Sequence, residues 1–172
     1  MIYIDIDQVI RNLLEPMGIE RTRYYAVKSE GKTLVEFYDT SPELLETAPA
    51  TEYCKVISAY FKEFKKTPIF ITSCKVSWIS PTTKWLDKHF HQGWRCKWVK
   101  EPEEKIELVG KGDFIIEDYP AFPKDFYKRV ILIRRGYNEM IPTSWLTSEK
   151  FSITQPLHLA KRLVALGKGE EE

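Results

Sequence analysis

The chain has 172 residues, a mass of 20.3 kDa and a formal net charge of +1 at pH 7. This length suits one compact domain over residues 1–172, and the near-neutral charge gives no general reason to expect a nucleic-acid or membrane partner. No apolar stretch approaches the roughly 20 residues that a membrane-spanning helix needs, and the first residues show no signal-peptide pattern. The cysteines lack metal-binding spacing and indicate free thiols in a reducing cytoplasm.

The first hydrophobic run, residues 2–4, is followed by two aspartates, Asp5 and Asp7. Because residues i and i+2 of a strand point to the same side, we expect the two carboxylates to converge at the carboxyl end of this strand. Two carboxylates that close together favour a bound cation, and one of them can attack while the other transfers a proton. The alternative is a solvated turn, since acidic residues are common at exposed strand ends.

After this strand, apolar runs alternate with helical patterns. Further strands are predicted at residues 68–73, 95–99, 113–118 and 129–133, and helices at 51–66, 80–90, 103–109 and 156–166. Thr51 is the expected N-cap of the first helix, and Pro81 is expected in the first turn of the second. The alternation favours an α/β fold, a three-layer Rossmann-like parallel sheet with helices on both faces. In such sheets ligands bind beyond the carboxyl ends of the strands.

Two segments do not follow this alternation. Residues 12–50 are polar and aromatic, with a hairpin expected around residues 24–38 that turns at Glu30 and Gly31. Residues 167–172 end in consecutive glutamates and are expected to form a flexible tail.

Polar side chains end further strands of the predicted sheet. Thr72 and Ser73 close the second strand, Glu117 and Asp118 close a later one, and Lys105 is expected at the start of a short helix. Alone, each pair would be ordinary polarity at a strand end or turn. Because the carboxyl ends of parallel strands meet at one edge, we expect these groups to cluster with the aspartate pair. Acids, hydroxyls and an ammonium together are what a phosphate monoester and Mg²⁺ require, which predicts phosphoryl-transfer chemistry.

In their order and positions these motifs resemble the haloacid dehalogenase superfamily, specifically its 5′-nucleotidase, deoxyribonucleotidase-type branch. Residues 4–7 resemble the first motif of the family, residues 71–73 the second and residues 112–118 the fourth. Residues 130–138 resemble the strand and Tyr-Asn tail that follow in this branch. Each motif is short, but the combination covers nearly the whole chain except residues 12–50.

The resemblance implies roles for the catalytic and phosphate-binding residues. Asp5 would be the nucleophile that forms an aspartyl-phosphate, and Asp7 the acid that protonates the leaving oxygen and then activates water. Thr72 and Ser73 would hydrogen-bond the phosphate, and Lys105 would neutralise it. The implied activity is a Mg²⁺-dependent phosphomonoesterase, a 5′-nucleotidase acting on (deoxy)ribonucleoside monophosphates.

The resemblance also implies the ligands of the Mg²⁺ ion. These would be Asp5, Asp7 through its backbone carbonyl, Glu117 and Asp118. Within the acidic doublet, Asp118 is favoured as the more direct ligand.

The chain departs from the family pattern at several positions. Gln8 stands where the family commonly has glycine, Glu117 where it has aspartate, and residues 74–75 where a proline often follows. The phosphate lysine has a second candidate, Lys111, but Lys105 is preferred because a helix start lets its side chain point back at the site. These departures leave open a catalytically weak member of the family that keeps the fold as a binding or regulatory protein.

Residues 12–50 occupy the position at which this superfamily inserts a cap, the part that recognises the leaving group of the substrate. Basic and aromatic residues are the candidates for stacking a base or sugar there: Arg21, Arg23, Tyr24, Tyr25, Phe37 and Tyr38. A rival function is a phosphatase of nucleic-acid ends, which would use the aromatic and basic stretch 89–100 as a stacking platform. Such a stretch more often packs its aromatic side chains inward.

Overall fold

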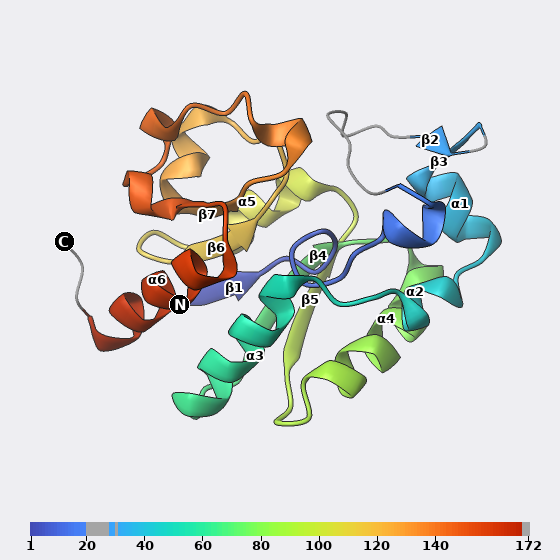
Figure 1. The fold of residues 1–172 in the computed structure, drawn as a ribbon, viewed down its shortest axis with the longest axis horizontal. Helices are drawn as coiled ribbons and strands as arrows, with labels where there is room; N and C mark the ends of the chain where they lie inside the picture. Colours follow the sequence, from blue (N-terminus) through green and yellow to red (C-terminus); the bar gives the residue numbers. More distant parts are fainter. Residues whose placement is uncertain (20–27, 30, 170–172) are drawn as a thin grey trace.

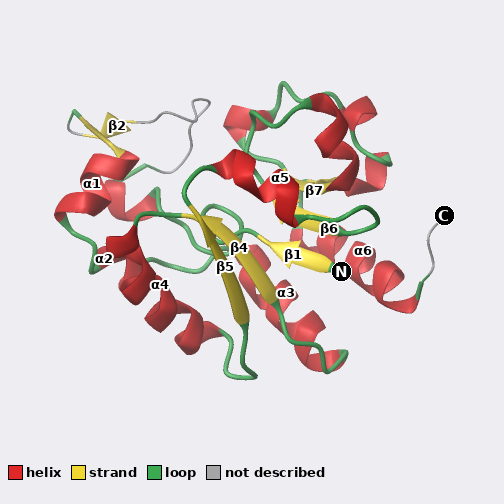
Figure 2. Cartoon of the chain, turned by 180° about the vertical axis from the view of Figure 1, so that it is seen from behind, coloured by secondary structure: helices red, strands yellow, loops and turns green. Residues whose placement is uncertain are grey.

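The computed structural model describes residues 1–19, 28–29 and 31–169. Within these residues the main sheet is all-parallel and has the strand order β5-β4-β1-β6-β7-β8 (Figures 1 and 2). Its strands are β1 (Ile2–Ile4), β4 (Ile69–Ser73), β5 (Arg95–Val99), β6 (Phe114–Glu117), β7 (Val130–Ile133) and β8 (Ser152–Ile153). The predicted α/β class with a parallel sheet is therefore confirmed.

Helices cover both faces of the sheet. The α-helices are α1 (Leu34–Thr40), α2 (Leu44–Thr47), α3 (Glu52–Glu63), α4 (Val76–His89), α5 (Lys105–Leu108) and α6 (Pro156–Lys168). The 3₁₀ turns are η1 (Glu15–Met17), η2 (Pro102–Glu104), η3 (Lys124–Arg129), η4 (Gly136–Asn138), η5 (Thr143–Trp145) and η6 (Glu149–Phe151). Helices α3, α4 and α6 lie along one face, while α5 and 3₁₀ turns cover the other (Figure 1). No helix in the described part of the chain is long and apolar enough to cross a membrane.

The central strands are apolar towards both layers of helices. Ile115, Ile116 and all of β7 are fully buried, as a parallel sheet covered on both faces requires. Helix α3 buries the side that carries Tyr53 and Ile57 against this core, so its apolar spacing has the helical period that the sequence predicts.

The predicted strands are found, but one helix cap and one helix start differ from expectation. Thr51 does precede α3, yet its hydroxyl donates to the Val9 carbonyl at 2.5 Å instead of capping the helix. The expected start at Ser80 is wrong, because α4 begins at Val76 and Pro81 lies inside it. A proline fits the first turn of a helix well, but here the residues before it are already helical.

The hairpin within residues 12–50 is shorter than expected. Strands β2 (Lys28–Ser29) and β3 (Lys32–Thr33) pair antiparallel, and Gly31 has a φ of 79° in the connection, whereas Glu30 lies outside the described residues. The predicted continuation to residue 38 is wrong, since α1 follows β3 directly. Its start is fixed by a capping box in which the Thr33 hydroxyl accepts from the Glu36 amide and the Glu36 carboxylate accepts from the Thr33 amide.

A second hydrophobic cluster attaches this insertion to α4. Its buried members are Leu13, Met17, Tyr38, Leu45, Ala48 and Trp78. The Tyr38 hydroxyl donates to the Leu13 carbonyl at 2.8 Å, and the Trp78 indole donates to Asp39 at 3.1 Å. The insertion is thus packed onto the core through its own small core.

Helix α6 extends further than expected and packs against α3. Gly167 and Lys168, predicted to belong to a flexible tail, continue this helix, and residues 170–172 lie outside the described part. A Cβ atom at Gly167 would lie 3.1 Å from both Phe64 Cε1 and the Tyr60 hydroxyl. Glycine at this position therefore permits the close approach of the two helices.

Candidate functional site

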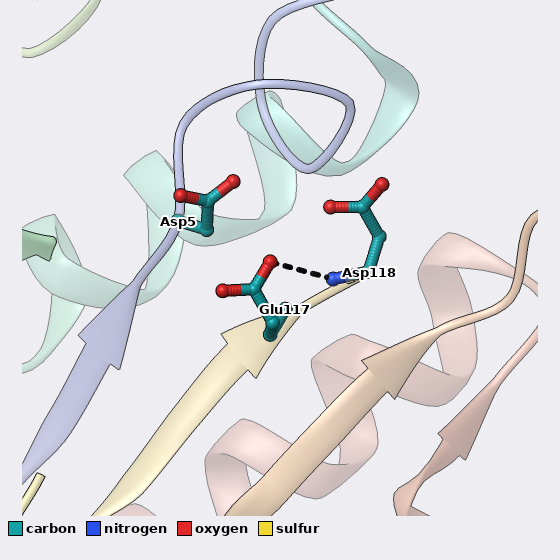
Figure 3. Close-up of side chains that lie close together, drawn as sticks. All are labelled: Asp5, Glu117 and Asp118. Atoms are coloured by element: carbon teal, nitrogen blue, oxygen red, sulfur yellow. Dashed lines mark hydrogen bonds between the residues drawn. The ribbon is translucent and has the colours of Figure 1, made fainter. Parts of the chain in front are cut away.

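Three buried carboxylates meet at the carboxyl edge of the sheet. Asp5 follows β1, Glu117 ends β6 and Asp118 comes directly after it. The Asp5 amide donates to the Ile116 carbonyl at 2.9 Å, which aligns the ends of the two strands. One oxygen from each carboxylate lies within 4.8 Å of the others (Figure 3). The structure thus brings together three of the four acids that the sequence places at this edge.

Lys105 lies between two of these acids. Its ammonium is 2.6 Å from Asp5 Oδ1 and 2.7 Å from Glu117 Oε2, and the side chain is buried. Burial opposes the charged form, but the carboxylates of Asp5 and Glu117 outweigh it and raise the pKa of Lys105. Lys111 is exposed in the turn before β6. Of the two candidate lysines, the structure therefore brings Lys105 to the acids.

Three carboxyl groups share one buried ammonium in this cluster. Burial, and then the Glu117 carboxylate, raise the pKa of Asp5 well above its ordinary value. Burial and Glu117 also raise the pKa of Asp118 to about 8, although the hydrogen bond from the Tyr137 hydroxyl opposes this. Crowded, desolvated carboxylates of this kind are stabilised by a cation.

The two members of the acidic doublet differ in their contacts. Glu117 Oε1 accepts from the backbone amide of Asp118 at 3.0 Å (Figure 3). The same oxygen accepts from the Tyr119 amide at 3.3 Å, while the other oxygen of Glu117 contacts Lys105. Glu117 thus folds back to organise the turn after β6. Asp118 accepts from the Tyr137 hydroxyl through Oδ2, and its expected role as the more direct ligand stays a prediction.

Asp7 does not join the carboxylate cluster. Its Oδ1 lies 2.8 Å from Arg11 Nε and 2.7 Å from Arg11 Nη2. The expectation that both aspartate side chains share one small volume is wrong, because β1 ends at Ile4 and the chain then turns, with the amides of Ile10 and Arg11 both donating to the Ile6 carbonyl. The alternation of a strand does not extend into such a turn. The Asp7 side chain is therefore not positioned as a ligand with the other three acids.

Gln8 has the backbone conformation that glycine usually provides. Its φ is 61°, in the left-handed region. The Gln8 carbonyl accepts from Arg135 Nε at 3.1 Å and from Nη2 at 2.5 Å. Arg135 also lies 3.5 Å from Glu52 at the start of α3. The turn after β1 is thus held by an arginine from the segment after β7.

That segment, residues 134–138, also supports the acidic doublet. Asn138 donates to the backbone carbonyls of Asp118 at 2.8 Å and Ile133 at 2.9 Å, and it accepts from the Arg135 amide at 2.9 Å. These supporting roles were not predicted. The resemblance in residues 130–138 was the available signal, but it concerns a motif and not the contacts that its members make.

Thr72 and Ser73 end β4, which is next to β1. Ile4 aligns with Phe70, so the two hydroxyl residues lie just beyond the carboxyl end of β1. Thr72 is buried and Ser73 is partly exposed. Both are therefore at the edge that the sequence predicts for phosphate binding.

The expected substrate-reading residues of the insertion have different outcomes. Arg21, Arg23, Tyr24 and Tyr25 lie outside the described residues. Tyr38 is fully buried in the small core, so the expectation that it stacks a base or sugar is wrong. Phe37 is partly buried and packs against the same core.

The aromatic stretch before and within β5 packs in part onto the main core. Trp94 contacts Phe70 with ring centroids 6.5 Å apart, and its indole donates to Asp87 at 3.0 Å. This favours inward packing over a stacking platform. The cysteines of the chain, Cys54, Cys74 and Cys96, are free.

Comparison with known proteins adds no relative. No model of a known protein family matches this chain, and no curated protein matches it significantly. The similarity to the haloacid dehalogenase superfamily thus rests on the short motifs of the chain.

Proposed function

We propose that this protein is a Mg²⁺-dependent phosphomonoesterase that forms an aspartyl-phosphate on Asp5. The observation that carries the proposal is the position of Asp5. One of its oxygens is 2.6 Å from the Lys105 ammonium, and its carboxylate lies within 4.8 Å of Glu117 and Asp118 at the carboxyl edge of the sheet. A carboxylate nucleophile beside a cation site and a fixed ammonium suits phosphoryl transfer, in which positioning and charge neutralisation dominate.

The donor set fits a divalent cation. Carboxylate oxygens are the hard ligands that Mg²⁺ takes in proteins. Burial, followed by the Glu117 carboxylate, raises the pKa of Asp5 and of Asp118, so a bound cation would stabilise the charged forms of both groups. Asp5, Glu117 and Asp118 would hold the ion. When bound, Mg²⁺ would neutralise and orient the oxygens of a phosphate group.

The chain's own residues account for both steps of hydrolysis. Because Lys105 contacts Asp5 Oδ1, Oδ2 attacks phosphorus; the bond from phosphorus to the leaving oxygen breaks, and Asp7 gives that oxygen a proton. In the second step Asp7 takes a proton from water, the water oxygen attacks phosphorus, and the bond to Asp5 breaks to release inorganic phosphate. Thr72 and Ser73 donate hydrogen bonds to the phosphate oxygens.

The proposed substrates are (deoxy)ribonucleoside monophosphates. This finer assignment is supported by the resemblance of the motifs to the 5′-nucleotidase branch and by the place of the insertion, which packs beside the carboxyl edge on α4. In this assignment the leaving group is the 5′ oxygen of a sugar that carries a base.

A substrate panel tests the proposal. Nucleoside monophosphates, sugar phosphates and 3′- or 5′-phosphorylated oligonucleotides are assayed for released phosphate with Mg²⁺ present, using the Asp5→Asn variant as the matched control. We expect phosphate release from the mononucleotides, lost in Asp5→Asn and after addition of EDTA. Preferential release from oligonucleotides would favour the nucleic-acid-end phosphatase. Metal binding without any turnover would overturn the enzymatic proposal and favour a binding or regulatory protein.

A further inference from the structure

A buried arginine lies behind the proposed proton-transfer residue. Arg11 is fully buried, which is costly for a cation unless each of its groups is paired. Its Nη1 donates to the Leu45 carbonyl at 3.2 Å and to the Thr82 hydroxyl at 3.0 Å, and its guanidinium lies 5.7 Å from the centre of the Trp85 ring. Arg11 is thus fixed by the insertion on one side and by α4 on the other.

The remaining two nitrogens of this guanidinium converge on one oxygen of Asp7. Nε and Nη2 lie 2.8 Å and 2.7 Å from Oδ1. A fork-to-fork arginine–carboxylate pair would use both oxygens, whereas here Oδ2 is not part of the contact. The Asp7 side chain keeps 20% of its surface exposed while that of Arg11 has none. The arrangement therefore anchors one oxygen of a carboxylate whose side chain stays partly accessible.

We infer that Arg11 is a positioning residue, which holds Oδ1 of Asp7 so that Oδ2 is the oxygen that exchanges protons with the leaving group and with water. The inference rests on the proposed function. Asp7 lies two residues after Asp5, in the turn that leaves β1. A general acid or base held within a fixed geometry transfers a proton more efficiently than a freely rotating one.

The same contacts connect proton transfer to the insertion. Arg11 reaches the backbone of Leu45 in α2, so the position of the insertion and the orientation of Asp7 depend on one side chain. A purely structural ion pair would only hold the insertion on α4. If Arg11 positions Asp7, changing Arg11 should affect the protonation of the leaving oxygen in particular. If Arg11 only holds the insertion, the change should not affect that step selectively.

The test measures how hydrolysis depends on the leaving group. Aryl and alkyl phosphates with leaving groups of increasing pKa are compared in wild type, Asp7→Asn, Arg11→Met and Arg11→Lys. Protonation of the leaving oxygen matters most for poor leaving groups, so we expect Arg11→Met to slow these at least about tenfold more than nitrophenyl phosphate. Asp7→Asn should also slow the substrates with poor leaving groups more than nitrophenyl phosphate. Arg11→Lys keeps the positive charge but loses the paired nitrogens of the guanidinium, so its effect should be intermediate.

A double variant and a matched control separate positioning from folding. If Arg11 acts through Asp7, adding Arg11→Lys to Asp7→Asn leaves the leaving-group dependence unchanged. Arg162→Met removes another buried arginine, which belongs to α6 and lies over the ring of Phe151, and should leave that dependence as in wild type. If Arg11→Met does not fold, Arg11→Lys and the double variant decide the question.

The outcomes are distinct. An active wild type whose folded Arg11 variants lose rate equally for all leaving groups overturns the inference and leaves the proposed function standing. A wild type that releases no phosphate from any substrate removes the proposed function, and the inference falls with it.

Discussion

Arg135 and Gln8 are joined across the sheet edge by two hydrogen bonds from one guanidinium to one carbonyl, at 3.1 and 2.5 Å. Gln8 has a positive φ, so the carbonyl that Arg135 holds belongs to a backbone conformation unfavourable for a residue with a side chain. The segment after β7 thereby stabilises the turn after β1. The turn in question carries Asp5 at its beginning and Asp7 at its centre.

The positive φ of Gln8 should affect the stability of the folded protein. Gln8→Gly should be more stable than Gln8→Ala by about 1 kcal/mol, because glycine adopts this φ without a steric penalty. The measurement is urea unfolding of the two variants. The same two substitutions at Lys65, which has a φ of 49° after α3, provide a control away from the site. Equal stability of the glycine and alanine variants at position 8 would contradict the strain.

The carboxylate cluster should bind and be stabilised by Mg²⁺. A ligand present at a hundredfold excess over its Kd stabilises the folded state by about 2.7 kcal/mol, so Mg²⁺ should raise the Tm of the wild type. Asp118→Asn should reduce this increase. Asp113→Asn, which changes an acid at the opposite end of β6 that pairs with the Met1 ammonium, should retain it. Tm is measured by calorimetry with Mg²⁺ and with EDTA, and an undiminished increase in Asp118→Asn would exclude that carboxylate as a ligand.

Without metal, the stability should fall as the pH rises through the titration of Asp118. Burial and Glu117 raise the pKa of this group from 3.8 to about 8. Between these values the folded state binds more protons than the unfolded state, so the free energy of unfolding decreases with increasing pH. The raised pKa of Asp5, which has burial as its largest cause, acts in the same direction.

Unfolding by urea in EDTA at several pH values between about 4 and about 8 measures this slope. Asp118→Asn should flatten it, and Mg²⁺ should oppose it because the ion binds the charged form. A stability that increases over this interval, with no change in Asp118→Asn, would contradict the raised pKa.

The two lysines near the acidic strand should differ in their effect on stability. Lys105→Met leaves Asp5 and Glu117 buried without their ammonium, so we expect a loss of about 3–5 kcal/mol, partly recovered by Mg²⁺. Lys111→Met changes an exposed turn residue and should stay within about 0.5 kcal/mol of wild type. Denaturant unfolding of both variants is the measurement. Similar losses in the two would mean that the Lys105 contacts do not stabilise the folded protein.

The sequence predicts the acidic edge well because that prediction needs only strand ends. Parallel strands deliver Asp5 and Glu117 to one edge whatever their loops do, and Lys105 follows from the helix that starts beside it. The pairing of Asp7 with Arg11 depends instead on the reversal of the chain at Gln8, which strand alternation does not describe. The roles of Arg135 and Asn138 arise from contacts between segments distant in the sequence, and no local pattern encodes such contacts.

Local signals also competed within the insertion. Val35 and Phe37 favour a strand, but the capping box between Thr33 and Glu36 fixes a helix start. Burial of Tyr38 against Trp78, with ring centroids 6.0 Å apart, then completes the small core. From the sequence alone, a tyrosine in a polar segment suggests a binding residue. Only the packed structure shows that Tyr38 is a core residue.

The absence of a side chain at Gly167 lets the last helix cover the aromatic side of α3. Any larger residue there would clash with Tyr60 and Phe64. The clash would also move Leu163, which is fully buried, away from the main core. Helix α3 and the last helix therefore depend on each other for folding. A protein shortened before α6 would present this aromatic side to water and would be expected to self-associate.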